Sequence, residues 1–138
     1  MRWLERAIGE TGLLAADTGD FGAAEGFIRR SLDLARELRN YRGERIGLTR
    51  LIDVLIQRQR MNLAEPLLLE SEQRNIESND QIGRAWNLKH RGQLEYARGN
   101  VETGNTLIRQ GIQQLIDMGE LDYVPDFTAV LILNLGKD

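Results

Sequence analysis

The sequence predicts an all-α fold, a solenoid of helical hairpins with about seven helices. One observation is an internal repeat with a period of 40 residues, in which a small, a large and a small residue recur at Ala24, Ile28 and Ser31, at Ala64, Leu68 and Ser71, and at Gly104, Ile108 and Gly111. Another is that apolar residues follow helical spacing and show no strand-like alternation. Repeats of this length are supersecondary units that bury a face only against their neighbours, which indicates stacked helix pairs.

The first repeat is expected over about residues 2–40. Its first helix covers about 2–18 and ends at Gly19, which tolerates positive φ, before Asp20, a good N-cap. The second helix covers about 21–39, with an apolar side formed by residues such as Phe21 and Leu34 and a charged side opposite.

The second repeat is expected over 43–80 and the third over 81–119, within a single domain 1–138. In the second repeat, a turn near residues 60–62 precedes a helix over 63–78, whose first turn holds Pro66. Because Gln59-Arg60 replaces the Gly-Asp turn there, we expect a less sharply defined corner. The third repeat has helices over 81–98 and 101–118, and a final helix covers about 125–135.

Composition disfavours an enzyme. The 138 residues include no cysteine and one histidine, His90, so thiolate zinc sites, cysteine nucleophiles and histidine clusters are excluded or hard to build. No carboxylate pair has the spacing of a general acid and base. We therefore expect no catalytic residues, no metal and no cofactor. The chain shows no signal peptide and no apolar run long enough to span a membrane, so a cytoplasmic location is predicted.

Charge gives no overall attraction to nucleic acid, because the net charge is −3. Nine arginines against four acidic residues between Arg29 and Arg60 form a local surplus, which could contact phosphate. Without aromatic residues between them, a solvated charged face is the favoured interpretation, so the predicted partners include no nucleic acid and no membrane.

The repeated small and large residues resemble the tetratricopeptide repeat pattern over almost the full length. The first helices match at Gly12, Ile52 and Gly92, and the second helices match at the small and large residues named above. The resemblance implies a right-handed superhelix. The 40-residue period is similar to the long-helix subgroup found in scaffold proteins and in bacterial STAND-class signalling ATPases; HEAT and armadillo repeats share the period but not the small-residue spacing.

The same resemblance implies that the first helix of each repeat lines a concave, partner-binding face. Carried over by position, this partner-binding set is Arg6, Leu13, Asp17, Thr49, Arg50, Asp53, Gln57, Trp86, Lys89, His90, Gln93 and Tyr96. Trp86 and Tyr96 are the preferred anchors, with packing between helices as an equally weighted alternative. His90 is interpreted as a groove or surface residue without catalytic duty. The residues by which relatives clamp a chaperone's terminal carboxylate are not matched.

The final helix is apolar around nearly its whole circumference, unlike the others. We expect it to dock against a second copy of the chain, or the sequence to be a fragment of a longer array. The predicted self-association residues are Phe127, Val130, Leu131, Leu133 and Leu135.

The sequence thus favours a non-catalytic module that binds a protein or peptide on its concave face. Two alternatives stay open. One is a regulatory or sensor segment of a larger bacterial signalling ATPase or transcription regulator, and the other is a homodimerisation unit that associates through the C-terminal helix.

Overall fold

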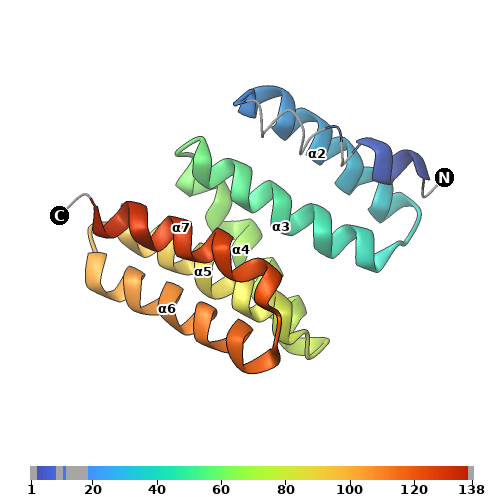
Figure 1. Cartoon of the computed structure of the whole chain (residues 1–138). Helices are drawn as coiled ribbons and strands as arrows, with labels where there is room; N and C mark the ends of the chain where they lie inside the picture. Colours follow the sequence, from blue (N-terminus) through green and yellow to red (C-terminus); the bar gives the residue numbers. More distant parts are fainter. Residues whose placement is uncertain (1–2, 9–10, 12–18, 137–138) are drawn as a thin grey trace. The chain divides into compact units, whose positions relative to one another are not determined.

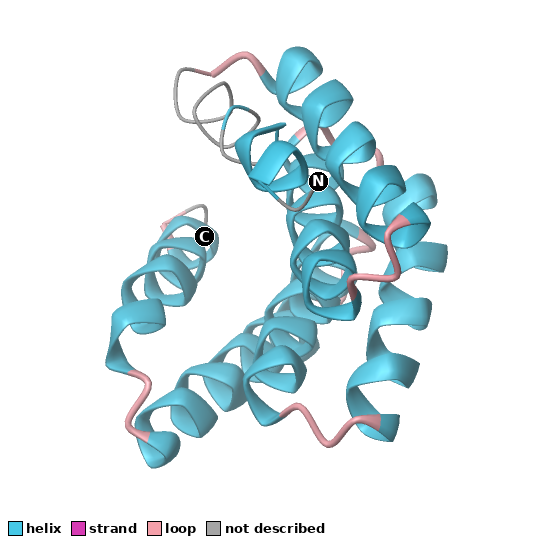
Figure 2. Cartoon of the chain, turned by 90° about the vertical axis from the view of Figure 1, so that its right-hand side faces the viewer, coloured by secondary structure: helices cyan, strands magenta, loops and turns pink. Residues whose placement is uncertain are grey.

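The computed structural model describes residues 3–8, 11 and 19–136, and this part of the chain is all-α, as predicted (Figures 1 and 2). Residues 3–8 are helical, and the remainder of the predicted first helix lies largely outside the described residues. The following elements are α2 (Phe21–Glu37), α3 (Tyr41–Gln57), α4 (Met61–Glu77), α5 (Gln81–Ala97), α6 (Val101–Met118), the 3₁₀-helix η1 (Leu121–Tyr123) and α7 (Val124–Leu135). No strand occurs in the described ranges.

The helices from α2 to α6 begin 20 residues apart, and the turns between them share one geometry. At each corner, a backbone N–H donates to the carbonyl five residues earlier, in the last turn of the preceding helix, for example Asn40 to Ala35 at 2.8 Å and Arg60 to Leu55 at 2.8 Å. The residue before each of these donors has positive φ, whether it is Gly99 at 93° or Gln59 at 59°. The prediction of a less sharply defined corner at Gln59 was therefore wrong.

Polar side chains cap the N-terminal ends of three of these helices. Asp20, Asn40 and Asp80 each accept a hydrogen bond from the backbone N–H three residues later, at 3.0–3.2 Å. Pro66 differs from expectation, because α4 begins at Met61 and so places the proline at its sixth residue. There it lies beyond the first turn and removes one hydrogen bond of the helix.

The described contacts divide the chain into two compact units, unit 1 (Met1–Leu67) and unit 2 (Leu68–Asp138). The boundary falls inside α4, so one helix contributes to both units, and the prediction of a single domain stays a prediction. In unit 1, α2 packs on α3. Its buried apolar residues are Ala24, Ile28, Leu32, Ala35, Leu48, Leu51, Ile52, Val54, Leu55, Ile56 and Ala64.

In unit 2, α5 packs on α6 and α7 packs on α6 (Figure 1). The closest approach of α5 and α6 is at Gly92 and Gly104, where a Cβ on either residue would lie 2.6 Å from the carbonyl oxygen of the other. Only glycine permits this backbone contact. A cluster of Ala85, Leu115 and Phe127 forms the core between the three helices, with Trp86 and Val124 packed against it. Helical-hairpin packing of consecutive helices is thus confirmed.

Candidate functional site

The predicted partner-binding residues divide between the two units. Arg6 and the α3 residues belong to unit 1, and the α5 residues belong to unit 2. Leu13 and Asp17 lie outside the described residues. The residues of unit 1 and those of unit 2 have different surroundings.

In unit 1, Arg6 and Arg50 meet at one cavity of about 440 Å³, here called the arginine cavity. A third arginine, Arg42, also lines it. The remaining lining residues are Glu5, Ser31, Asn40, Gly43, Ile46 and Gly47. Three guanidinium groups therefore border a space that also contains an apolar side chain, Ile46, which is 40% exposed.

A buried carboxylate, Glu5, forms part of the cavity wall. The amide of Asn40 donates to both carboxylate oxygens of Glu5, at 3.2 and 3.0 Å, while its own oxygen caps α3 at Gly43. The hydroxyl of Ser31 donates to the Glu5 carbonyl at 2.8 Å. A Cβ at Gly43 would overlap the Glu5 carboxylate, so this glycine is what lets the acid lie against the start of α3.

The electrostatic balance of the arginine cavity is positive. Within the described residues, Arg6 and Arg42 make no ion pair, and both side chains are exposed. Glu5 is the one carboxylate that the described residues contribute to the wall, and its oxygens already accept from Asn40. An anionic group that entered the cavity would gain charge-assisted hydrogen bonds from guanidinium forks, and it would displace no ion pair that Arg6 or Arg42 makes with another described residue.

The other predicted α3 residues are partly accessible. Thr49 and Asp53 are half-buried, and Gln57 is exposed near the C-terminal end of the helix. They follow Ile46 and Arg50 at three- and four-residue spacing, so they continue the same face of α3. The predicted set in unit 1 therefore forms a mixed polar and apolar strip that begins at the arginine cavity.

Part of the arginine surplus has a structural role. Glu25 of α2 pairs with Arg29 at 3.1 Å and with Arg58 at 2.9 Å, and Arg60 lies 4.0 Å away. Burial alone would raise the pKa of Glu25, but hydrogen bonds and charges from Arg29 and Arg58 outweigh it and lower the pKa. This cluster ties the end of α3 to α2.

In unit 2, the preferred anchor Trp86 is half-buried and packs against η1 and α7. Its ring lies 5.0 Å from the ring of Phe127 and 5.9 Å from that of Tyr123, both edge-on. The ammonium group of Lys89 lies 4.7 Å above the Trp86 ring and 5.7 Å from the Phe127 ring, a cation–π arrangement. These contacts agree with the packing alternative for Trp86, whose side chain is half-buried.

The neighbouring α5 residues are also largely covered. Lys89 is 4% exposed and His90 is 1% exposed, so the prediction of a groove or surface position for His90 was wrong. The hydroxyl of Tyr96 donates to the carbonyl of Asn134 in α7 at 3.4 Å. Gln93 is half-buried, and within the described residues its buried Oε1 has no hydrogen-bond partner. Three residues of this α5 face, Trp86, Lys89 and Tyr96, therefore contact the chain's own α7.

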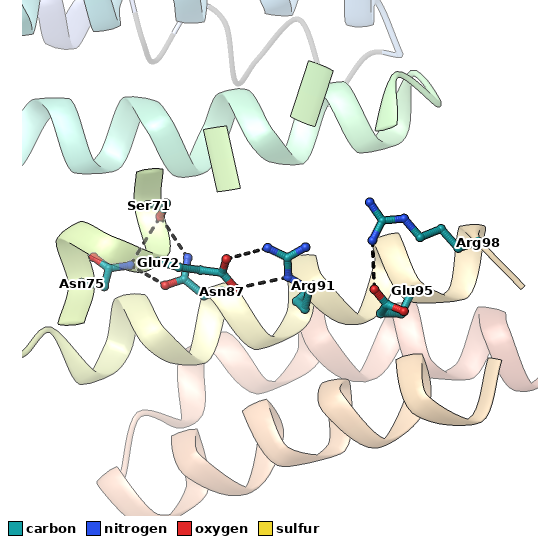
Figure 3. A network of polar contacts seen from close by, with 7 residues as sticks. All are labelled: Ser71, Glu72, Asn75, Asn87, Arg91, Glu95 and Arg98. Atoms are coloured by element: carbon teal, nitrogen blue, oxygen red, sulfur yellow. Dashed lines mark hydrogen bonds and ion pairs between the residues drawn. The ribbon is translucent and has the colours of Figure 1, made fainter. Parts of the chain in front are cut away.

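A polar network between α4 and α5 was missed by the sequence reasoning (Figure 3). The amide of Asn87 donates to Ser71 at 2.9 Å, and Asn75 donates to Asn87 at 2.8 Å, all within buried surroundings. On the same helices, Arg91 makes two contacts with the carboxylate of Glu72. A signal was present, since Ser71 occupies the repeated small position, but nothing in the sequence pairs it with Asn87.

The predicted self-association residues of α7 lie on different sides. Phe127 is fully buried in unit 2 and is not available to another molecule, which corrects that prediction. Its ring fills the space next to Gly111, where a Cβ would lie 3.0 Å from it. Val130 and Leu131 are half-buried. Leu133 and Leu135 are exposed, as is the preceding residue Ile132.

Among the described residues, no group of three or more His, Asp or Glu side chains could hold a metal ion. None of the helices described is both long and apolar enough to cross a membrane. No protein-family model matches the chain, and neither does any curated protein.

Proposed function

We propose that this chain is a non-catalytic protein-interaction module that binds a peptide or protein segment, and that the arginine cavity receives an acidic group of that segment. The observation that carries the proposal is the meeting of Arg6, Arg42 and Arg50 around one cavity, with two of the three outside any ion pair of the described residues. The acidic group is an Asp or Glu side chain or a terminal carboxylate.

The surroundings of the cavity suit a peptide better than a small anion alone. Ile46 offers exposed apolar area beside the guanidinium groups, and the α3 face continues past it to Gln57. Interfaces combine apolar contact with charge-assisted hydrogen bonds, and arginine is enriched in them. A segment along α3 would therefore place its acidic group at Arg6 and Arg42 and an apolar residue at Ile46.

The tetratricopeptide resemblance supports the same class of function. Helical hairpins at a 40-residue period agree with such an array, and the predicted lining of the first helices includes both Arg6 and Arg50. The alternative of a sensor segment from a larger signalling protein draws on the same resemblance, and no contact in the structure favours it.

The test selects peptides from a random library with the full chain and then measures their affinity. We expect the selected sequences to be rich in Asp and Glu, with an affinity that falls as salt is added. Reversing the charge in Arg6→Glu/Arg42→Glu should weaken binding at least about tenfold, the effect of losing two charge-assisted contacts.

The matched control reverses two exposed arginines elsewhere, Arg30→Glu/Arg109→Glu, which gives the same net charge. This variant should bind the selected peptides with nearly unchanged affinity. An equal loss in both variants would show a nonspecific charge effect and would refute the cavity as the site. Selection of peptides without acidic residues would refute it too.

A further inference from the structure

The outward face of α7 is apolar and uncovered within unit 2. Ile132 is 62% exposed, Leu133 is 64% exposed and Leu135 is 45% exposed. Together with exposed Ala129, they form a strip at helical spacing along the side of α7 that faces away from Phe127 and Asn134. This strip is here called the α7 face.

The internal repeat shows what kind of element covers this face elsewhere in the chain. Forty residues before Ile132 lies Gly92 of α5, which packs on α6 at Gly104 and Ile108. Forty residues earlier still lies Ile52 of α3, which is fully buried. In the two earlier repeats, this position therefore lies on the side of the first helix that packs against the second helix of the same repeat. In α7, the same side is exposed.

The second helices share one pattern on the side they bury. Each presents a small residue, a large aliphatic residue four positions later and a small residue three positions after that, and these residues are buried in α2, α4 and α6. At the position that faces Ile52, the second helix α4 has a small residue, Ala64. Because Ile132 is as large as Ile52, the helix that covers α7 also needs a small residue opposite Ile132.

The acidic residues around α7 indicate which charge the bound helix carries. Residues 110–136 contain four acidic residues, Asp117, Glu120, Asp122 and Asp126, and no lysine or arginine. Asp122 and Asp126 are exposed at the N-terminal end of α7. A helix that packs antiparallel on α7 would place its C-terminal end there, where basic residues also interact favourably with its own dipole.

We propose that the α7 face is a docking site for a basic amphipathic helix of another protein, with the small-large-small pattern on its apolar side. A second copy of the chain is a poor occupant, because its own small-large-small sides are already buried in α2 and α6. The partner helix packs on α7 in the same way as α6 packs on α5, so that it forms the second helix of a hairpin-like pair.

The probe is a synthetic peptide with the sequence of residues 20–39, in which Lys replaces Asp33 and Glu37. Both replaced residues are exposed on α2, and the changes raise the peptide's formal side-chain charge from zero to +4. We expect the full chain to bind this peptide with a 1:1 stoichiometry in calorimetry. An otherwise identical peptide with Asp in place of Ile28 should bind at least about tenfold more weakly, because its apolar side is interrupted.

The variant Ile132→Asp of the full chain should also lose at least about tenfold in affinity for the probe. The control is Ile76→Asp, which alters an exposed isoleucine of α4 and should bind as the wild type does. Circular dichroism verifies that both variants are folded. No binding of the probe, or equal binding by the Ile132→Asp variant, would overturn the proposal. So would a dimer in sedimentation that the Ile132→Asp variant loses, since a second copy would then occupy the face.

Discussion

The ring of Phe127 in α7 packs edge-on against the ring of Trp86 in α5, with centroids 5.0 Å apart and planes at 76°. The sequence had assigned these residues to two different surfaces, one for a partner and one for a second copy of the chain. Their contact buries Phe127 fully and Trp86 in part within unit 2. The arginine cavity and the α7 face are the two surfaces that we propose for a partner.

Replacing Phe127 with alanine should destabilise unit 2 by about 3–5 kcal/mol, because a fully buried aromatic ring leaves a cavity. Urea unfolding measures this loss. In a Trp3→Phe background, the fluorescence of Trp86 should also shift to longer wavelength, since its covering ring is gone. The exposed residue Leu133 provides the control, and Leu133→Ala should change stability by less than about 0.5 kcal/mol. Equal effects of the two substitutions would contradict the packing of α7.

Two glycine-to-alanine substitutions should have opposite effects on stability. At Gly92, the added methyl group meets the Gly104 carbonyl oxygen at 2.6 Å and Ile108 at 2.7 Å, so the α5–α6 pair must separate, at a cost of about 3 kcal/mol or more. At Gly26 in α2, the added Cβ meets nothing within 4 Å, and alanine should stabilise the helix by about 0.5–1 kcal/mol. Thermal unfolding compares the two, and a harmless Gly92→Ala would refute the close helix contact.

Removing the Asn87 amide should destabilise the chain by about 1–3 kcal/mol, because the change to alanine removes two buried hydrogen bonds and leaves Ser71 and Asn75 with the longer bond between them, at 3.4 Å. A double-mutant cycle with Asn75→Ala tests the mechanism, since residues in one network are coupled by at least about 0.5 kcal/mol. Ser78→Ala, which removes an exposed hydroxyl, is the control. Additive effects of the Asn75 and Asn87 substitutions would indicate that the network contributes no joint stability.

The Glu25 cluster predicts a pH dependence of stability. Because the folded state lowers the pKa of Glu25, the ionised carboxylate stabilises the fold above the ordinary value of 4.5, and this contribution is lost as pH falls through the lowered pKa. The difference in unfolding free energy between wild type and Glu25→Gln should be about 1 kcal/mol near pH 7 and should shrink in acid. Urea titrations from pH 7 to pH 3 measure it. Asp33→Asn, which removes an exposed carboxylate of α2, is the control variant.

The period and the helix pattern were predictable because they are local. Small and large residues at fixed spacing identify each second helix, and Asp20, Asn40 and Asp80 mark starts of helices. The left-handed corner at Gln59 was not predictable from residue type, because the hydrogen bond from Arg60 to Leu55 imposes it on a residue that seldom adopts positive φ.

The candidate site was predictable in part. Position within the repeat brought Arg6 and Arg50 into the same set, and the structure places both at the arginine cavity. Arg42 was missed, because it lies at the start of α3 and not on the expected lining. The sequence left Trp86 equally open to a groove position and to packing between helices, since periodicity does not distinguish an aromatic residue that faces solvent from one that a later helix contacts. The contact of Trp86 with Phe127 of α7 agrees with packing.

The equal corners every 20 residues make this chain intolerant of small changes in length. Adding one residue inside a helix rotates everything that follows by about 100° about the helix axis, so the next corner would direct the chain away from its partner helix. Removing or duplicating a block of 40 residues keeps every later helix in phase. We therefore expect length variation in such a chain to occur in whole hairpins, with the corners as joining points.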